Sequence, residues 1–513
     1  MARGAIDAGI SGVYAYPGTP STEITEYIQN RSQNEGIFSQ WATNEKTAME
    51  GALGMSYMGK RALVCMKHVG MNVAADAFVN SAVSGIHGGV VVLVADDPSM
   101  HSSQNEQDSR FYAKFAMVPS FEPSSQQEAY EMMSYAFDMS EELRTPVLMR
   151  ITTRMAHSRA VVKLGDKREQ NVMNACEDDP RRWILLPANA RRRYNTLVAL
   201  QDEFTKRSEE SRFNRYHSGE DKSLGVIASG IAWNYLNENF PEGLPYSAIK
   251  VSQYPLPKGL ITKLYDECDR ILVLEDGQPV IEEQMRGVMD INRIAGRLDG
   301  AVPRVGELTP DNIKSALGLE SQQSFLPSEF VVARPPALCI GCGHRDVYAA
   351  LNKIVAEYGN AKVFSDIGCY TLGALPPFTA IDSTIDMGAS VTMAKGAADA
   401  GKHPSLAVIG DSTFTHSGMT GLLDAVNSKS RMTLIISDNL TTAMTGGQDS
   451  AGTGRLEAIC AGLGVEQEHI RVVVPLPKNM EQIEQIMREE IEYDGVSVII
   501  PRRECIQTLK KKK

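Results

Sequence analysis

The stretch that decides the fold is Ala407-Val-Ile-Gly410-Asp411-Ser412, taken together with Leu434-Ile-Ile-Ser-Asp438-Asn439. Each is a short apolar run that ends in polar residues, and Asn439 follows Asp411 by 28 positions. In an open α/β sheet, ligands bind at the carboxyl ends of the strands. Two neighbouring strand ends would therefore present the carboxylate of Asp411 and the amide oxygen of Asn439 together.

Oxygen ligands of this kind suit a Mg²⁺ ion that holds a diphosphate. Gly410 allows a close approach of the backbone. We expect a helix after Phe414, whose N-terminus would point at the phosphates. A Gly-Asp pair after a strand is usually only a turn, but the second polar strand end favours a magnesium diphosphate site.

The rest of the chain alternates short apolar runs with helical stretches, which is the pattern of α/β units on parallel sheets. We therefore predict an α/β protein with three doubly wound parallel-sheet domains. Helical patterns cover 1–9, 43–58 and 125–142. Strands are expected at 12–15, 62–66, 89–95, 147–151, 224–229, 270–275, near 363, and at 406–409, 434–437, 472–474 and 496–500.

Composition shifts divide the chain into four segments. A first α/β domain covers 1–162, and a charge-dense connecting segment with helices covers 163–222. A second α/β domain covers 223–320 and a third covers 335–513. The stretch from Thr309 to Pro336 has the composition of a linker that ends in Arg334-Pro-Pro.

The chain has 513 residues, with 52 Lys and Arg against 63 Asp and Glu and a formal charge of −11. This balance argues against nucleic-acid binding, because there is no excess of cations to neutralise phosphates. No run approaches the ~20 apolar residues that span a bilayer, and Met1 does not begin a signal peptide. We expect a soluble, cytoplasmic protein that does not associate with membranes.

Further motifs extend the pattern at both ends of the chain. The Gly-Asp and Asn pair resembles the thiamine diphosphate signature, with Ser412 where glycine is usual. Four stretches look like the thiamine-binding half of 2-oxoacid:ferredoxin oxidoreductases: 339–344, 365–373, 386–390 and 444–448. Three others, 16–22, 44–48 and 103–110, look like their pyrimidine-binding domain.

The order of these domains in one chain is similar to the α subunit of indolepyruvate ferredoxin oxidoreductases, over nearly the whole chain. The resemblance implies a pyrimidine-binding domain at 1–162, a transketolase C-terminal-like middle domain at 223–320 and a diphosphate- and magnesium-binding domain at 335–513. That α subunit usually continues into a ferredoxin-like domain with Cys-rich motifs, and this chain ends at Lys513 without one. We expect either a truncated chain or a short form that passes electrons another way.

The resemblance implies roles for individual residues. Glu45 would activate the cofactor by placing a carboxyl group against the pyrimidine ring, although a first-turn Glu often only complements the helix dipole. Thr19, Arg110 and His68 are candidates for the substrate side. The residues expected to bind cofactor are Gly410, Asp411, Ser412, Asn439, Thr441, His344 and Met387, with Asp411, Asn439 and the carbonyl of Thr441 as Mg²⁺ ligands.

Four of the eight cysteines have the spacing of metal ligands. Cys339 and Cys342 form a Cys-x-x-Cys pair, Cys369 follows 27 positions later, and Cys505 follows 136 positions after that. Four thiolates suit a [4Fe–4S] cluster or Zn²⁺, and packed free thiols are the third alternative. Cys65, Cys176, Cys268 and Cys460 lack such spacing.

By this resemblance, the activity is oxidative decarboxylation of an aryl 2-oxoacid, such as indolepyruvate, to acyl-CoA and CO₂. Coenzyme A would be a co-substrate and ferredoxin the electron acceptor. The implied partner is a smaller β subunit, in a hetero-oligomer or a homodimer. Two alternatives are a non-oxidative thiamine diphosphate-dependent decarboxylase and a thiamine-binding subunit that has lost turnover. Both Glu45 and the Asp411–Asn439 pair argue against the last.

Overall fold

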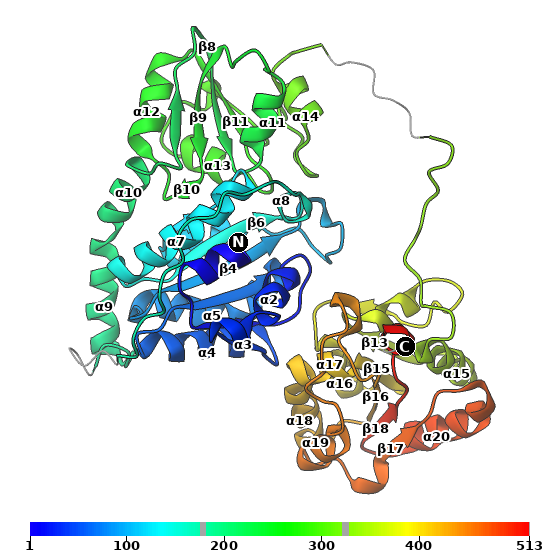
Figure 1. Ribbon diagram of the computed structural model, residues 1–513. Helices are drawn as coiled ribbons and strands as arrows, with labels where there is room; N and C mark the ends of the chain where they lie inside the picture. Colours follow the sequence, from blue (N-terminus) through cyan, green and yellow to red (C-terminus); the bar gives the residue numbers. More distant parts are fainter. Residues whose placement is uncertain (175–180, 321–327, 512–513) are drawn as a thin grey trace. The chain divides into compact units, whose positions relative to one another are not determined.

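The computed structural model describes residues 1–174, 181–320 and 328–511 (Figure 1). Cys176 and part of the expected linker lie outside these residues. The chain forms two compact units, 1–325 and 326–513, and each is described by itself. The two units together contain three sheets of mostly parallel strands, which confirms the predicted α/β class.

The first sheet has seven strands in the order β10-β5-β6-β4-β3-β1-β2. All of its strands pair in parallel except the short β10, which pairs antiparallel with β5. The strands are β1 (Gly12–Ala15), β2 (Phe38–Trp41), β3 (Ala62–Lys67), β4 (Val90–Asp96), β5 (Ser120–Phe121), β6 (Val147–Thr152) and β10 (Gln253–Tyr254).

Helices cover both faces of this sheet, and their boundaries follow from local signals. Asn44 caps one helix and forms a reciprocal capping box with Thr47, and Ser125 caps another, as expected for these side chains. The helices are α1 (Ala2–Asp7), α2 (Thr22–Gln29), α3 (Ser32–Glu35), α4 (Glu45–Tyr57), α5 (His68–Ser84), α6 (Arg110–Ala116), α7 (Gln126–Leu143) and α8 (Thr153–His157).

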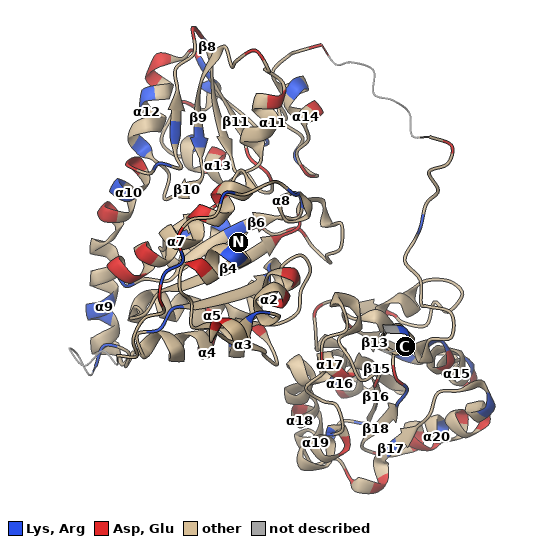
Figure 2. Ribbon diagram, in the orientation of Figure 1, with Lys and Arg blue, Asp and Glu red and all other residues tan. Residues whose placement is uncertain are grey.

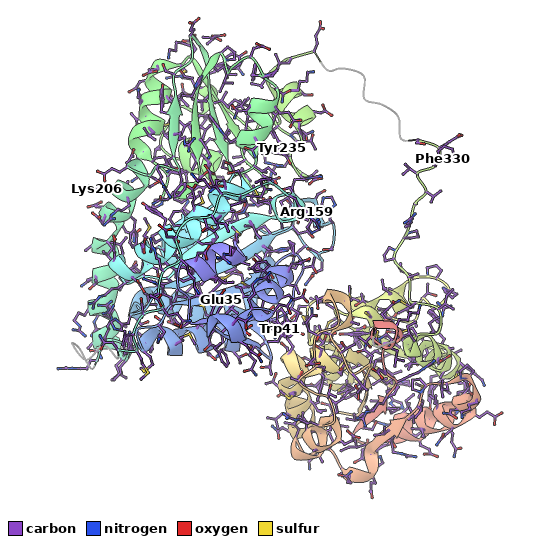
Figure 3. All side chains as sticks on the ribbon, viewed as in Figure 1. Glu35, Trp41, Arg159, Lys206, Tyr235 and Phe330 are labelled. Carbon is purple, nitrogen blue, oxygen red and sulfur yellow. The ribbon has the colours of Figure 1, made fainter. Side chains whose placement is uncertain are left out.

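Alternate residues of each central strand enter two different apolar clusters. On β3, Leu63 and Cys65 belong to one cluster, whereas Val64 and Met66 belong to the other. Every residue of β4 is buried, as expected for a parallel sheet covered on both faces. Side chains fill the space between sheet and helices, and Trp41, labelled at the end of β2, packs against the first cluster (Figure 3).

The middle sheet has the order β12-β11-β8-β9-β7. It consists of β7 (Arg215–His217), β8 (Asp221–Ser229), β9 (Tyr246–Val251), β11 (Arg270–Leu274) and β12 (Ile294–Ala295), with helices α11 (Ala232–Glu238), α12 (Lys258–Glu267) and α13 (Val280–Arg286). The charged segment before it contains α9 (Pro187–Ala199) and α10 (Gln201–Glu209), as predicted.

The structure differs from the expected domain boundaries in three places. β7 falls inside the expected connecting segment but pairs antiparallel with β9 of the middle sheet. β10 falls inside the expected middle domain but extends the first sheet. The expected linker begins with a helix, α14 (Pro310–Ala316), which Thr309 caps and which packs against α11. β7 and β10 have only three and two residues, so the sequence does not reveal them without their partner strands.

The second unit has a six-stranded, fully parallel sheet in the order β14-β13-β15-β16-β18-β17. Its strands are β13 (Lys362–Ser365), β14 (Ser383–Thr384), β15 (Ser405–Gly410), β16 (Met432–Ser437), β17 (Ile470–Val473) and β18 (Val496–Pro501). Its helices are α15 (Gly343–Tyr358), α16 (Ala389–Asp399), α17 (Asp411–Thr413), α18 (Met419–Asn427), α19 (Leu456–Gly462), α20 (Met480–Glu492) and α21 (Ile506–Lys511).

A buried network of charges joins the first and middle sheets. Arg150 of β6 is fully buried, and its guanidinium contacts Asp96 at 2.5 Å, Glu122, and the carbonyl of Asp276 at 2.9 Å. Asp276 follows β11 of the middle sheet. Because buried charges are costly unless they are paired, these contacts fix the middle sheet against the first.

Elsewhere, helices such as α10, α12 and α20 carry Lys and Arg mixed with Asp and Glu (Figure 2). Within the described ranges, no helix combines the length and apolar character needed to cross a membrane.

We expect Arg150→Met to destabilise the first unit by about 3–5 kcal/mol, because it leaves buried carboxylates without their cation. Thermal and urea unfolding would measure the change. The matched control in the same unit is Arg168→Met, which removes an exposed ion pair with Asp138 and should cost less than about 1 kcal/mol. Equal effects of the two variants would contradict a structural role for the network.

Candidate active site

The two polar strand ends lie side by side, as the sequence predicted. β15 and β16 are parallel neighbours, with Gly410 opposite Ser437, so Asp411 and Asp438 follow equivalent positions on adjacent strands. Asn439 comes next, and its side-chain oxygen accepts a hydrogen bond from the backbone N–H of Thr441 at 3.2 Å. We call Gly410, Asp411, Ser412 and Asn439 the diphosphate motif.

Asp411 has the surroundings of a cation ligand. Its carboxylate is buried, and Oδ2 has no hydrogen-bond partner among the described residues. Burial and the nearby carboxylate of Asp438 raise the pKa of Asp411 to about 7. Asp438 is itself paired with Arg502 at 2.6 Å. A carboxylate oxygen without a partner among the described residues, on a strand end that neighbours the one carrying the Asn439 amide oxygen, is the kind of donor that Mg²⁺ prefers.

The helix at this strand end begins earlier than the sequence predicted. We expected it after Phe414, whereas Asp411 is already its first residue, and a π-helical turn at Phe414–Gly418 continues it into α18. An aspartate in the first turn complements the helix dipole, which favours this earlier start. The backbone N–H groups of this end lie directly at the diphosphate motif.

The loops around the motif hold the other predicted cofactor residues. Ser412 contacts Thr442 through their hydroxyl groups at 2.9 Å, and the Thr441 hydroxyl donates to the carbonyl of Gln448 at 3.0 Å. Met387 is half-buried in the loop before α16. His344 is buried on α15, with Nε2 unpartnered among the described residues, and burial lowers the pKa of its ring to about 4.

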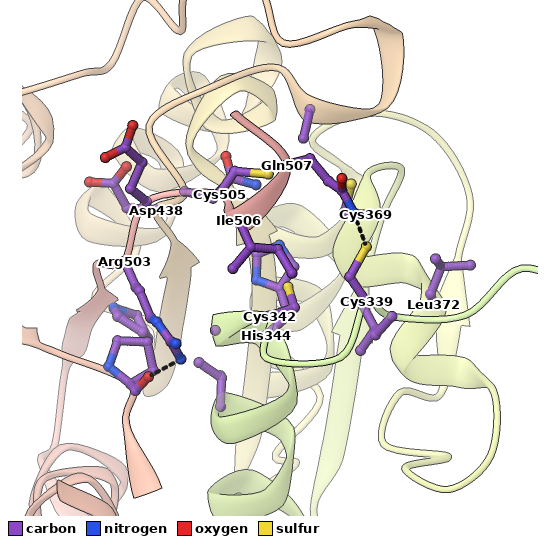
Figure 4. A pocket seen from close by; sticks show the side chains of 18 of the residues that line it. Cys339, Cys342, His344, Cys369, Leu372, Asp438, Arg503, Cys505, Ile506 and Gln507 are labelled. Atoms are coloured by element: carbon purple, nitrogen blue, oxygen red, sulfur yellow. Dashed lines mark hydrogen bonds between the residues drawn. The ribbon is translucent and has the colours of Figure 1, made fainter. Parts of the chain in front are cut away.

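The four cysteines with metal-ligand spacing line one cavity of about 170 Å³. They come from the loop before α15, the loop after β13 and the segment after β18, and Figure 4 shows them around the same space. We call this space the four-cysteine cavity. His344, Asp438 and Asn439 also line it, so it adjoins the diphosphate motif.

The thiols of this cavity are close enough to influence one another. Burial, together with the neighbouring thiols of Cys342, Cys505 and Cys339, raises the pKa of Cys369 to about 12. Thiolates therefore need a metal to form here. Among the described residues, no three of these sulfurs lie within 4.8 Å of one another. A tetrahedral Zn²⁺ with Zn–S bonds of about 2.3 Å would need a tighter set.

Glu45 is the first residue of α4 in the first unit, and it is buried. A Cβ atom added at Gly70 of α5 would lie 2.4 Å from its Oε1 and 2.6 Å from its Cγ. Gly70 therefore provides the space that the Glu45 carboxyl group occupies. The sequence did not single out Gly70, because this contact depends on how α4 and α5 pack.

The predicted substrate-side residues have different surroundings. Thr19 is half-buried in the turn before α2. His68 is buried at the start of α5, with Nε2 at 3.2 Å from the carbonyl of Asn105 and Nδ1 unpartnered among the described residues. Arg110 is buried and contacts Asp108, Glu275 and the carbonyl of Gln278. The structure thus places Arg110 in the charge network between the sheets.

Two further residues, Asp366 and Tyr370, lie beside the predicted site, although no role was predicted for them. Asp366 follows β13 just as Asp411 follows β15, so the polar residue after an apolar strand was an available signal. Asp366 accepts hydrogen bonds from the hydroxyl groups of Tyr370 and Ser390. Tyr370 packs against Gly410, where an added Cβ would lie 2.7 Å from its Cε1. Only the folded structure reveals that second contact.

Comparison with known families identifies both halves of the chain. Residues 3–197 match the family described as "Pyruvate flavodoxin/ferredoxin oxidoreductase, thiamine diP-bdg". Residues 366–500 match "Thiamine pyrophosphate enzyme, C-terminal TPP binding domain". The chain is thus a thiamine diphosphate-dependent enzyme of the 2-oxoacid:ferredoxin oxidoreductase class, as the sequence predicted.

Individual relatives narrow this class. The chain is 38% identical over 530 residues to "Indolepyruvate oxidoreductase subunit IorA" of Methanothermobacter thermautotrophicus, covering 98% of this chain and 85% of the relative. It is 37% identical over 552 residues to the protein of the same name from Thermococcus kodakarensis, covering 98% and 84%. The chain belongs to this IorA family.

Among solved structures, a 2-oxoglutarate:ferredoxin oxidoreductase from Magnetococcus marinus is similar, with 15% identity and a TM-score of 0.48. The match covers 62% of this chain and 63% of that one.

We expect Gly70→Ala to reduce turnover by about 100-fold, because the added methyl group displaces the Glu45 carboxyl group and small misplacements of a reacting group are costly. The flexible Glu45 side chain can move, so the variant should still fold. Gly54→Ala is the control, since that position on α4 has nothing within 4 Å of an added Cβ. Steady-state kinetics and circular dichroism would decide; unchanged turnover in Gly70→Ala would argue against a catalytic Glu45.

We expect Asp411→Asn to weaken Mg²⁺-dependent binding of thiamine diphosphate by at least about 100-fold, because a neutral amide replaces a charge-bearing ligand. Isothermal titration calorimetry at several Mg²⁺ concentrations would measure this. Asp424→Asn, at an exposed position of α18, should bind like the unchanged protein. If Asp411→Asn retained full affinity, the metal site would have to lie elsewhere.

Proposed function

We propose that this chain is the catalytic subunit for oxidative decarboxylation of an aryl 2-oxoacid, such as indolepyruvate, to acyl-CoA and CO₂. Cys339, Cys342, Cys369 and Cys505 would hold a [4Fe–4S] cluster, which would supply the electron transfer to ferredoxin. The name of the IorA relatives, indolepyruvate oxidoreductase, supports this substrate. Coenzyme A takes the acyl group, and a smaller β subunit completes the enzyme.

The single observation that carries the oxidative assignment is the four-cysteine cavity beside the diphosphate motif. Four thiols from three separate segments converge there. No three of the described sulfurs lie as close together as one zinc ion requires, whereas the four thiolates of a [4Fe–4S] cluster bind different irons and can lie farther apart. A non-oxidative decarboxylase has no use for such a site, because its reaction releases no electrons.

The diphosphate motif provides the charge and geometry for the cofactor. Thiamine diphosphate, when bound, supplies the carbanion chemistry that 2-oxoacid decarboxylation requires. Asp411, the Asn439 amide oxygen and the Thr441 carbonyl would hold the Mg²⁺ ion of its diphosphate. The backbone N–H groups at the helix start at Asp411 would bind the phosphates.

The first unit provides the acid. Glu45 would hold a proton at the pyrimidine ring of the cofactor, and its burial against Gly70 keeps the carboxyl group away from water. Thr19 and His68 are the candidate donors for the substrate carboxylate. Nδ1 of His68 has no partner in the part of the chain that the structure describes, which supports this role. Arg110 would act from the charge network, by positioning the loop that precedes it.

Iron and acid-labile sulfide, measured on the full chain purified without oxygen, test the assignment. We expect about four irons per chain, and loss of most of this iron in Cys342→Ser. Cys460→Ser is the matched control, because Cys460 is a buried thiol of the same unit that packs in the apolar core. With the β subunit, indolepyruvate and coenzyme A, the protein should reduce ferredoxin.

Three results would contradict the proposal in different ways. Stoichiometric zinc would identify a structural metal site. Free thiols, with aldehyde as the product, would favour a non-oxidative decarboxylase. Bound iron without indolepyruvate turnover would leave the oxidative class in place and change the substrate.

A further inference from the structure

The four-cysteine cavity and the diphosphate motif are connected through the backbone at Cys505. The N–H group of Cys505 donates to the carbonyl of Asn439 at 3.1 Å, and the N–H group of Arg503 donates to the carbonyl of Asp438 at 2.9 Å. The segment that carries the last cysteine therefore runs along the end of β16. A displacement of Cys505 would move one predicted ligand of Mg²⁺.

A second connection runs through Tyr370, which directly follows Cys369. Its ring packs against Gly410, since a Cβ atom added there would lie 2.7 Å from Cε1 of Tyr370. Its hydroxyl group donates to Oδ1 of Asp366, and its carbonyl accepts from the hydroxyl group of Tyr348 at 2.6 Å. Tyr370 is buried, so a movement of Cys369 is transmitted to these contacts.

Asp366 extends this connection to the next loop. Its second oxygen, Oδ2, accepts from the hydroxyl group of Ser390 at 2.6 Å, from the N–H of Gly388 at 3.2 Å and from the N–H of Ser390 at 3.3 Å. This loop carries Met387, a predicted cofactor residue. Asp366 and Tyr370 thus join three segments of the predicted cofactor site.

The ring of His344, on α15, contacts Tyr370 from another side. It meets the Tyr370 ring edge-on, with centroids 6.4 Å apart and planes at 88°. His344 also lines the four-cysteine cavity. One aromatic ring therefore lies between a residue of the cavity wall and the glycine of the diphosphate motif.

We propose that Tyr370 is a positioning residue that couples the four-cysteine cavity to the diphosphate motif. A cluster bound to Cys369 fixes that residue, which fixes the Tyr370 ring against Gly410 and orders the loops that hold the diphosphate. Thiamine diphosphate then binds more tightly to a chain with loaded cysteines, and by linkage it stabilises the bound cluster. The inference rests on the proposed function for the identity of both groups.

We expect each group to strengthen binding of the other, because these loops have to be ordered only once. Whichever group binds first immobilises residues 369–370 and the backbone pair at Asn439 and Cys505. The second group then meets a site that is already ordered, so its binding carries a smaller loss of conformational entropy.

The experiment compares the dissociation constant for thiamine diphosphate with saturating Mg²⁺ in iron-loaded and iron-stripped protein. Isothermal titration calorimetry on the full chain, without oxygen, gives both values. We expect the loaded chain to bind about tenfold more tightly, within the usual range of coupling between sites. Tyr370→Phe loses the hydrogen bond to Asp366. In this variant the ratio of the dissociation constants of the stripped and loaded protein should fall toward one.

Tyr358→Phe is the matched control. Tyr358 is the last residue of α15, and this variant removes its hydrogen bond of 2.8 Å to Glu492. It should show the same ratio of dissociation constants as the unchanged protein. Asp366→Asn provides a second variant if Tyr370→Phe does not fold. Its amide nitrogen would face the donors of Gly388 and Ser390, so we again expect a reduced ratio.

A protein that binds no iron would overturn both the cluster assignment and the coupling. Bound iron with equal dissociation constants in the two states would overturn the coupling and leave the proposed function intact. A normal ratio in Tyr370→Phe would show that Tyr370 does not carry the coupling. A lower melting temperature in that variant, with an unchanged ratio, would assign Tyr370 to stability alone.

Discussion

The sheet of the second unit is buried on both faces, and this burial determines where its polar groups can lie. Every residue of β15 and β16 is buried, so the chemistry-bearing side chains gather after the strands end. Asp366, Asp411 and Asp438 all follow strands that are neighbours in the sheet. Carboxylates this close together in a buried setting repel one another, and each requires a compensating group.

The protein compensates these carboxylates in three different ways. Asp438 has a cation, Arg502. Asp366 has hydroxyl and backbone donors. Asp411 has one oxygen without a partner within the described ranges, which is the feature that favours an external cation. Asp438 is thus satisfied by an ion pair and Asp366 by hydrogen bonds. Of these three carboxylates, Asp411 alone has the properties of a metal ligand among the described residues.

Much of this arrangement was predictable from the sequence, because it depends on local patterns. The strand at Gly12–Ala15 has the predicted bounds, and the adjacent ends of β15 and β16 follow from apolar runs with polar ends. β5, β10, β12 and β14 are two residues long, so their existence depends on partner strands that no local pattern reveals. The space that Gly70 leaves for Glu45, the packing of Tyr370 on Gly410 and the burial of Arg110 all depend on tertiary contacts.

The charge network between the first and middle sheets has a consequence for how this architecture can be recombined. Arg110 and Arg150 come from the first sheet and its loops, whereas Glu275 and the carbonyl of Asp276 come from the middle one. A chimera that takes its middle domain from a relative would place unmatched charges at a buried boundary. The first and middle domains must therefore be exchanged together, with both sides of the network. For protein engineering, these two domains form one module.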